Sequence, residues 1–365
     1  MKTRRMFSKF EPYSWETSTT EIASAMRLRS SKIIRMDTNT SPYLPRDSLR
    51  ALSKEATKMR VNDYPDTSYL GVRRELSNYC ELGIENFVVT NGADEALDII
   101  TKTLLDPGDE VLVPSPSYSM FRVASELMGA KTIIVPRKED FRIDTEKIES
   151  KISKKTKIIF LCSPNNPTGN SSSLKEVKSL LNMQGNKTIV IDEAYFEFSG
   201  KTFAKLASEH DDLLVVRTFS KAFSMAGVRV GYIIASKKNI NKLNLVRPPN
   251  SVGVISLFLA QNALKDKASM NKNVRAIVAE REKMIRILRR EDKVKVFPSQ
   301  ANFVLFRPTN GHSQKLHGLL MKKGFVLRNF SDYLGIEGCL RVTVNTPKVN
   351  VSFLNQLSQE LHSLD

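Results

Sequence analysis

The sequence predicts an α/β protein. We expect a large domain with a mostly parallel sheet sandwiched by helices, followed by a smaller α+β domain. Three observations lead to this prediction. Helical and strand patterns alternate from about residue 68 to 246. Short β-branched or apolar runs are bounded by turn residues, which is typical of buried parallel strands. The segment Arg247-Pro248-Pro249-Asn250 then ends the alternation.

The elements of the large domain follow one another along the chain. A helix is expected over residues 68–82, and the turn Asp106-Pro107-Gly108-Asp109 separates a later helix from a strand. Further helices are expected at 92–105 and 117–129. Strands are expected at 87–90, 110–114, 131–136, 157–162, 188–192, 213–218 and 229–235. This order favours helices on both faces of one sheet.

The second domain begins with a long helical stretch, about residues 254–290, which is interrupted near Asp266. Strands are then expected at 294–297, 302–307, 325–329 and 340–344, and helices at 312–323 and 348–364. We therefore divide the chain into a large domain, 46–247, and a small domain, 248–365. Residues 1–45 lack a strong period and are expected to associate with the small domain or with a partner subunit.

Composition narrows the class of protein. Of the 365 residues, 41% are hydrophobic and 26% charged, as in a globular protein, and no apolar run reaches ~18 residues, so no membrane span is expected. Cys80, Cys162 and Cys339 are too far apart for a metal site or a disulfide framework, which indicates the cytoplasm. The net charge of +17 is spread along the chain. It suits anionic small molecules, and no nucleic-acid partner is expected.

Lys221 lies in the most informative segment, which runs from Thr218 to Gly231 and also contains Ser220 and Arg229. A lysine flanked by hydroxyls and followed by an arginine suits a cofactor with an aldehyde and a phosphate. Lys221 would bond to the aldehyde and, once freed, would act as a base. The hydroxyls of Thr218 and Ser220 and the Arg229 guanidinium would bind the phosphate.

The other half of the phosphate site is expected at Gly92, Ala93 and Asp94, which follow one strand and open a helix. Their amides would point at an anion, with the helix dipole behind them. Alone, this segment would also fit ordinary helix capping by Asp94.

Asp192 should emerge at the carboxyl end of its strand, where active sites of α/β proteins form. A carboxylate there keeps a pyridine nitrogen protonated, so that the ring acts as an electron sink. Tyr195 and Asn166 would hold the ring's phenolic oxygen, and Tyr118 would stack on the ring, although a buried aromatic fits Tyr118 about equally well. Together these residues predict pyridoxal 5′-phosphate as cofactor, with Lys221, Asp192 and Tyr195 as catalytic residues and no metal.

Arg341 lies inside the apolar run Leu340–Val344, and Arg328 follows another apolar run. A buried guanidinium needs an anion, and a substrate carboxylate or phosphate would supply one. An internal ion pair is the structural alternative for both arginines.

These motifs, in this order, resemble those of the fold-type-I pyridoxal-phosphate aminotransferases, most closely the histidinol-phosphate aminotransferase subgroup. The resemblance runs from about Asp37 to Pro347. Its strings are Tyr64-Pro65-Asp66, Asn91-Gly92-Ala93-Asp94-Glu95, Ser163-Pro164-Asn165-Asn166-Pro167-Thr168-Gly169, Asp192-Glu193-Ala194-Tyr195, Ser220-Lys221-Ala222-Phe223, Gly227-Val228-Arg229-Val230-Gly231 and Gly338-Cys339-Leu340-Arg341-Val342-Thr343.

The resemblance implies a seven-stranded sheet and a homodimer with shared active sites, in which Tyr64 reaches the cofactor phosphate of the neighbouring subunit. It also implies that Arg341 and Arg328 anchor the anionic ends of glutamate and of a phosphorylated amine, with Asn39 and Tyr13 nearby. The chain departs from the subgroup at Asn39-Thr40-Ser41-Pro42 and at Pro12-Tyr13-Ser14-Trp15. Both departures lie in the segment that shapes the substrate pocket.

The function that the resemblance implies is transamination between glutamate and imidazole-acetol phosphate, which yields histidinol phosphate, in histidine biosynthesis. Decarboxylation of threonine phosphate, or aminotransfer to aromatic or aspartate-type substrates, would use the same fold. A DNA-binding regulator is a further alternative, but it would carry an added helix-turn-helix region for which no segment has room.

Overall fold

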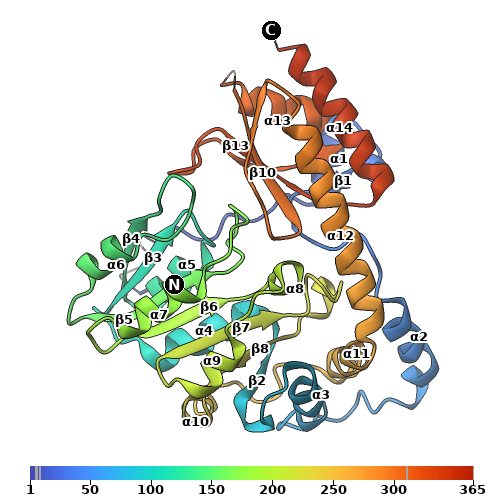
Figure 1. Cartoon of the computed structure of the whole chain (residues 1–365). Coiled ribbons are helices and arrows are strands. Elements are labelled where there is room, and N and C mark those ends of the chain that lie inside the picture. The colour runs from blue at the N-terminus through green and yellow to red at the C-terminus, as the bar shows by residue number, and fades with distance from the viewer. Residues whose placement is uncertain (5–6, 8–9, 310, 365) are drawn as a thin grey trace.

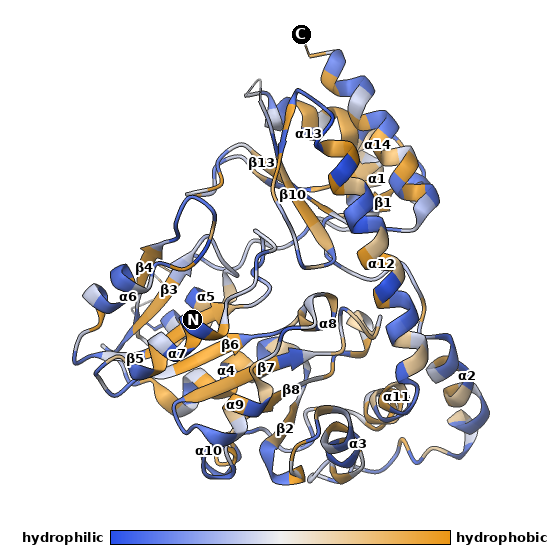
Figure 2. Ribbon diagram, viewed as in Figure 1, coloured by the Kyte–Doolittle hydropathy of each residue, from blue (hydrophilic) through white to orange (hydrophobic). Residues whose placement is uncertain are grey.

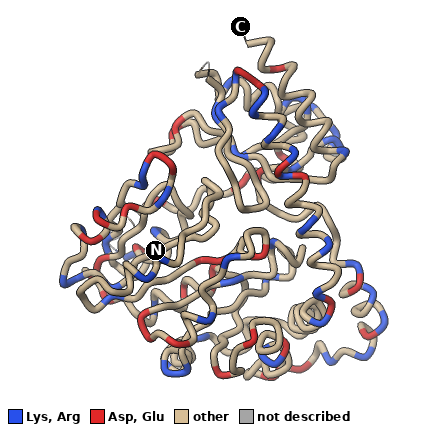
Figure 3. The backbone as a smooth tube through the Cα atoms, in the orientation of Figure 1, with Lys and Arg blue, Asp and Glu red and all other residues tan. Residues whose placement is uncertain are grey.

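A computed structural model describes residues 1–4, 7, 10–309 and 311–364. The molecule has two parts, with the long helix α12 (Lys267–Leu288) running between them (Figure 1). The lower part in that view contains the larger sheet, and the upper part contains the smaller sheet and the C-terminal end of the chain. Lys and Arg occur on both parts (Figure 3).

The larger sheet has seven strands in the order β2-β8-β7-β6-β5-β3-β4. All neighbouring pairs are parallel except those made by β8, which runs antiparallel to β2 and to β7. The strands are β2 (Phe87–Thr90), β3 (Glu110–Ser115), β4 (Lys131–Pro136), β5 (Thr156–Cys162), β6 (Thr188–Asp192), β7 (Leu213–Thr218) and β8 (Gly231–Ile234). The predicted mostly parallel sheet is therefore confirmed.

Helices cover both faces of this sheet, whose strands form an apolar layer inside the molecule (Figure 2). The side chains of one strand alternate between two hydrophobic clusters: Ile159 and Leu161 belong to one, Ile158 and Phe160 to the other. The helices of this part are α2 (Arg46–Glu55), α3 (Leu70–Cys80), α4 (Gly92–Leu104), α5 (Met120–Leu127), α6 (Thr145–Lys151), α7 (Leu174–Asn182), α8 (Phe196–Ser199), α9 (Ala204–Glu209), α10 (Lys237–Leu243) and α11 (Val254–Lys265).

The smaller sheet has four antiparallel strands in the order β12-β13-β10-β9. Its strands are β9 (Val294–Val296), β10 (Phe303–Pro308), β12 (Arg328–Phe330) and β13 (Cys339–Thr343), and its helices are α13 (Ser313–Lys322) and α14 (Pro347–His362). The N-terminal segment adds α1 (Thr19–Met26) and β1 (Ile34–Arg35), and β1 pairs in parallel with β11 (Phe325–Val326). Residues 34–35 therefore lie against the smaller part.

Two expectations about elements were wrong in detail. The helix expected from Ser117 begins only at Met120, because Ser117 and Tyr118 are held by tertiary contacts: Ser117 Oγ donates to Asn165 Oδ1 and the Tyr118 hydroxyl to Asp94, each at 2.9 Å. The strand expected over 325–329 is two strands, because β11 pairs with β1 whereas β12 pairs with β13.

No helix in the described ranges is both long and apolar enough to cross a membrane. The described residues also contain no group of three or more side chains placed to hold a metal ion.

Candidate active site

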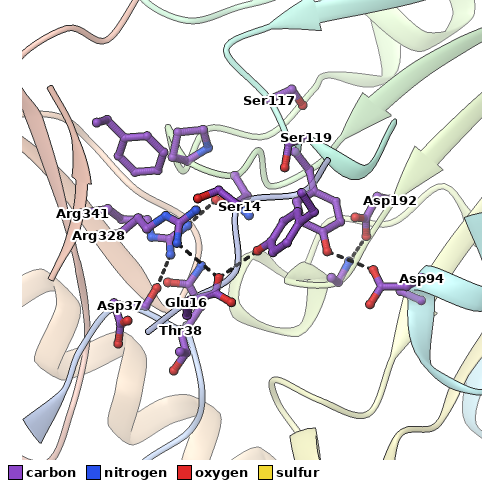
Figure 4. Close-up of a pocket in the computed structure, with 18 of the residues that line it drawn as sticks. Ser14, Glu16, Asp37, Thr38, Asp94, Ser117, Ser119, Asp192, Arg328 and Arg341 are labelled. Carbon is purple, nitrogen blue, oxygen red and sulfur yellow. Dashed lines mark hydrogen bonds and ion pairs between the residues drawn. The ribbon is translucent and has the colours of Figure 1, made fainter. Parts of the chain in front are cut away.

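A cavity of about 660 Å³ opens where the large sheet, the small sheet and the N-terminal segment meet (Figure 4). It lies at the carboxyl ends of the parallel strands, where ligands bind in such sheets. Every residue that the sequence analysis selected lines it except Gly92 and Tyr64. The lining residues among them are Tyr13, Asn39, Ala93, Asp94, Tyr118, Asn166, Asp192, Tyr195, Thr218, Ser220, Lys221, Arg229, Arg328 and Arg341.

Lys221 follows the end of β7 and is half-buried, with its Nζ donating to the carbonyl of Thr38 at 3.1 Å. Burial and the nearby Arg341 lower the pKa of Lys221 to about 8. Near pH 7, the fraction of Lys221 amines that are uncharged is therefore larger than for an ordinary lysine. Only the neutral amine can attack a carbonyl or accept a proton.

Asp192 is the last residue of β6 and is 3% exposed. Its carboxylate accepts a hydrogen bond from the amide of Ala194 at 2.9 Å. Burial nevertheless raises the pKa of Asp192 to about 7, because this bond and the charge of Lys221 offset the desolvation only in part. A cation placed beside Asp192 would restore the carboxylate to its charged form.

The N-terminus of α4 and the β7–β8 region lie close together and gather hydrogen-bond donors. Gly92 has φ +78°, and a Cβ on Gly231 would lie 2.5 Å from the carbonyl carbon of Gly92, so only glycine lets α4 approach β8 this closely. Arg229 Nη1 donates to Ser220 Oγ at 3.3 Å, and Thr218 Oγ1 donates to the same oxygen at 2.9 Å. Arg229 also lies 3.4 Å from Asp94, which partly neutralises it.

Tyr195, Asn39 and Asn166 occupy the side of the cavity that faces the small sheet. Asn39 is buried and donates to the Tyr195 hydroxyl at 3.0 Å. Asn166 Oδ1 accepts from Arg341 Nη1 at 2.5 Å. Tyr118 also lines the cavity, and burial followed by the charge of Asp94 raises the pKa of its hydroxyl. These groups supply neutral hydrogen-bond donors and an aromatic face around the centre of the cavity.

The two predicted anion-binding arginines differ in their partners. Arg341, on β13, is 6% exposed and binds neutral oxygens, Asn166 Oδ1 and the Asp37 carbonyl. Burial lowers the pKa of Arg341 to about 10. Arg328, on β12, forms an ion pair with Glu16 at 3.3 Å. Arg328 thus has a carboxylate partner within the described part of the chain.

Tyr64 lies outside the cavity, and 86% of its surface is exposed. Tyr64 therefore does not contribute to the cavity of its own subunit.

Several residues that sequence reasoning missed also shape the site. Glu16 and Thr38 come from the segment without a clear period, so no pattern signalled them. Glu193 and Arg217 form a buried ion pair at 3.0 Å behind the cavity. A signal for this pair existed, because Arg217 is a charged residue within an apolar strand run, Glu193 directly follows another such run, and each is next to a selected residue.

A family comparison decides the broad class of this site. The family model described as "Aminotransferase class I and II" matches residues 31–356. The chain belongs to the class I and II aminotransferases. This aminotransferase is 36% identical over 329 residues to the histidinol-phosphate aminotransferase of Caldanaerobacter subterraneus subsp. tengcongensis, covering 90% of this chain and 93% of the relative. It is 33% identical over 364 residues to the enzyme of the same name from Methanocaldococcus jannaschii, covering 98% and 97%.

Solved structures agree with the fold. The histidinol-phosphate aminotransferase from Clostridium acetobutylicum superposes with a TM-score of 0.84 at 27% identity, covering 91% of this chain and all of that one. The enzyme of that name from Sinorhizobium meliloti, solved in complex with pyridoxal 5′-phosphate, gives a TM-score of 0.89 at 20% identity, covering 100% and 98%. The predicted membership of fold type I is thereby confirmed.

Pyridoxal 5′-phosphate is the cofactor of this aminotransferase. The residues present fit it: the buried Asp192 carboxylate, whose pKa burial raises to about 7, suits the ring nitrogen, and the donors at Gly92, Ser220 and Arg229 suit the phosphate. When bound, the cofactor withdraws electrons from the carbon that bears the amino group.

Proposed function

We propose that the protein transfers an amino group between glutamate and imidazole-acetol phosphate, which yields 2-oxoglutarate and histidinol phosphate. The observation that carries the proposal is the similarity to histidinol-phosphate aminotransferases over 90% of the chain. The cavity supports it, since two arginines, Arg328 and Arg341, face one space of about 660 Å³ and suit anionic substrates.

We assign the residues as follows. Lys221 would hold the cofactor aldehyde and, once released, would move the proton at the substrate carbon, for which its lowered pKa suits it. Asp192 would keep the ring nitrogen protonated, while Asn166 and Tyr195 would hold the ring oxygen. Tyr118 would pack on the ring face.

The phosphate of the cofactor would lie on the amides of Gly92, Ala93 and Asp94, the hydroxyls of Thr218 and Ser220, and Arg229. Arg341 would bind the first substrate anion because no described carboxylate competes for it within 4.0 Å. Tyr13 and Asn39 would complete the substrate pocket.

We also propose a homodimer in which Tyr64 reaches the cofactor phosphate of the other subunit. Large apolar side chains are exposed around Tyr64, among them Val61 at 63% and Leu245 at 84%. Arg247 donates to the carbonyl of Thr67, which brings the two segments together. An exposed apolar surface of this kind suits a subunit interface.

Mixing two inactive variants tests the shared site. If Lys221→Ala and Tyr64→Ala subunits exchange, the mixed dimer has one site with both lesions and one with neither. Activity should then reappear in the mixture. A protein that sediments as a monomer, or a mixture that stays inactive, would contradict the proposal.

The substrate is tested by half-reactions. The holoenzyme is mixed with one amine at a time, and loss of the absorbance of the lysine-bound cofactor is followed. Histidinol phosphate should react faster than aspartate, phenylalanine or tyrosine. A faster reaction with one of those amino acids would replace histidinol phosphate as the proposed substrate.

Threonine-phosphate decarboxylation remains the second candidate, since a protein with that title shares the fold at 23% identity. A decarboxylase releases carbon dioxide and needs no amino acceptor. Turnover of histidinol phosphate that depends on 2-oxoglutarate, without carbon dioxide release, would exclude it.

A further inference from the structure

The segment of residues 11–17, here called the N-terminal strap, crosses the mouth of the cavity. Its two ends are tied to different parts of the molecule. Arg122 on α5 donates to the carbonyl of Glu11 at 3.0 Å, and Arg35 donates to the carbonyl of Thr17 at 3.0 Å. Glu11, Tyr13 and Glu16 all line the cavity.

Glu16 places a carboxylate on one of the two cavity arginines (Figure 4). Its Oε1 accepts from Arg328 Nη1 at 3.3 Å and from the Tyr13 hydroxyl at 2.8 Å. Burial and Glu16 raise the pKa of Tyr13 to about 12, so this donor keeps its proton throughout the physiological range. The carboxylate is thus held in place from two sides.

Arg341 offers the contrast. No described carboxylate lies within 4.0 Å of its guanidinium, and its Nε has no hydrogen-bond partner. An anion can bind Arg341 without removing another anion. Glu16 occupies Nη1 of Arg328, so an anion that is to bind this nitrogen must replace Glu16.

We propose that Glu16 is a resident anion in the substrate site, which holds Arg328 until a substrate anion replaces it. Glu16 then determines the affinity for every substrate whose anionic group reaches Arg328, and leaves binding at Arg341 alone unaffected. The proposal rests on the substrate role assigned above to Arg328. When a substrate carboxylate replaces Glu16 on Arg328, one carboxylate–guanidinium pair is exchanged for another of the same kind. The reaction therefore remains possible once residues 11–17 have moved.

The size of the effect follows from the exposure of the pair. The side chains of Arg328 and Glu16 are 27% and 32% exposed. Pairs of this exposure are weak, so their removal should change affinity about two- to fivefold. A change of several hundredfold would not fit this pair.

The chain contains its own reporter of the displacement. Trp15 is the single tryptophan of the sequence and is 84% exposed. Its ring packs edge-on against Tyr13, with 5.8 Å between centroids. Trp15 and Glu16 are consecutive residues of the strap, so we expect Trp15 fluorescence to follow replacement of the carboxylate.

The test titrates the holoenzyme with glutarate, a dicarboxylate that has no amino or oxo group and can reach both arginines, and with inorganic phosphate, a single anion that can bind at Arg341 alone. Binding is measured by calorimetry and by Trp15 emission. Glu16→Gln should bind glutarate about two- to fivefold more tightly and phosphate with unchanged affinity, and Tyr13→Phe should shift the glutarate affinity in the same direction by less. The matched control is Glu11→Gln, which removes an equal charge from an 87% exposed site on the same strap and should stay within about 1.5-fold of wild type.

Three results would overturn the proposal. They are an unchanged glutarate affinity in Glu16→Gln, an equal gain in Glu11→Gln, and calorimetric binding of glutarate to wild type without any change in Trp15 emission. Neither probe carries an amino group, so the outcome is independent of which amine the enzyme uses. A failure of histidinol phosphate in the half-reaction screen would leave this result standing.

Discussion

Asp192→Asn should stabilise the cofactor-free protein at high pH, although it removes a residue that we assign to catalysis. Burial raises the pKa of Asp192 from 3.8 to about 7 in the folded chain. Between these two values the folded state binds more protons than the unfolded state. The folded state therefore loses stability as pH rises from about 4 to 7, and the full cost applies above pH 7.

The raised pKa of Asp192 lowers the free energy of unfolding by about 4 kcal/mol at pH 8 and by about 1.5–2 kcal/mol at pH 5. Both values use about 1.36 kcal/mol per pKa unit. The assay is urea unfolding of cofactor-free wild type and Asp192→Asn at both pH values. Relative to wild type, the variant should gain about 2–3 kcal/mol more at pH 8 than at pH 5. Reconstitution with the cofactor is the control, because a ring cation beside Asp192 should make wild type the more stable protein.

An equal difference between the two proteins at pH 5 and pH 8 would refute the reasoning. It would mean that Asp192 ionises in the cofactor-free fold as an exposed carboxyl does, and that its single bond from Ala194 is sufficient.

Three other changes have defined outcomes. Lys221→Ala should abolish turnover and the absorbance of the lysine-bound cofactor, and an unchanged spectrum would contradict the assignment. Arg217→Met should lower the free energy of unfolding by about 3–5 kcal/mol, since it leaves Glu193 buried without a counter-ion; a midpoint in urea like that of wild type would speak against this. Arg341→Lys should lower kcat/KM for glutamate about 10- to 100-fold, because lysine cannot bind a carboxylate in the bidentate geometry. The measurement is steady-state kinetics, and a decrease of less than about 10-fold would contradict this role of Arg341.

Much of the fold could be predicted because its strands are short apolar runs between turn residues. Strand β2 is found at the residues expected, and the helix interruption near Asp266 lies between α11 and α12. The segment at Ser117 and Tyr118 could not be predicted, because hydrogen bonds to Asn165 and Asp94, distant in sequence, keep it out of the helix. Local pattern carries no information about such partners.

The candidate site likewise contains residues that the sequence could predict and residues that it could not. Asp192, Asn166 and Lys221 were found because each follows a recognisable strand, and a sheet brings strand ends together. Glu16 and Thr38 were missed because they belong to a segment whose position depends on ion pairs and backbone contacts with remote residues, Arg328 and Lys221.

The alternation of side chains along two strands links the hidden ion pair to the cavity. Asp192 and Thr218 end β6 and β7 and face the cavity, whereas their chain neighbours Glu193 and Arg217 meet on the other side of the sheet, 3.0 Å apart. The amide of Glu193 also donates to the carbonyl of Val216 at 2.8 Å. The buried Glu193–Arg217 pair thus connects the ends of β6 and β7. These ends bear Asp192, assigned to the ring nitrogen, and Thr218, assigned to the phosphate. The charge pair can hold that spacing because its partners are 0% and 3% exposed and water does not screen their attraction.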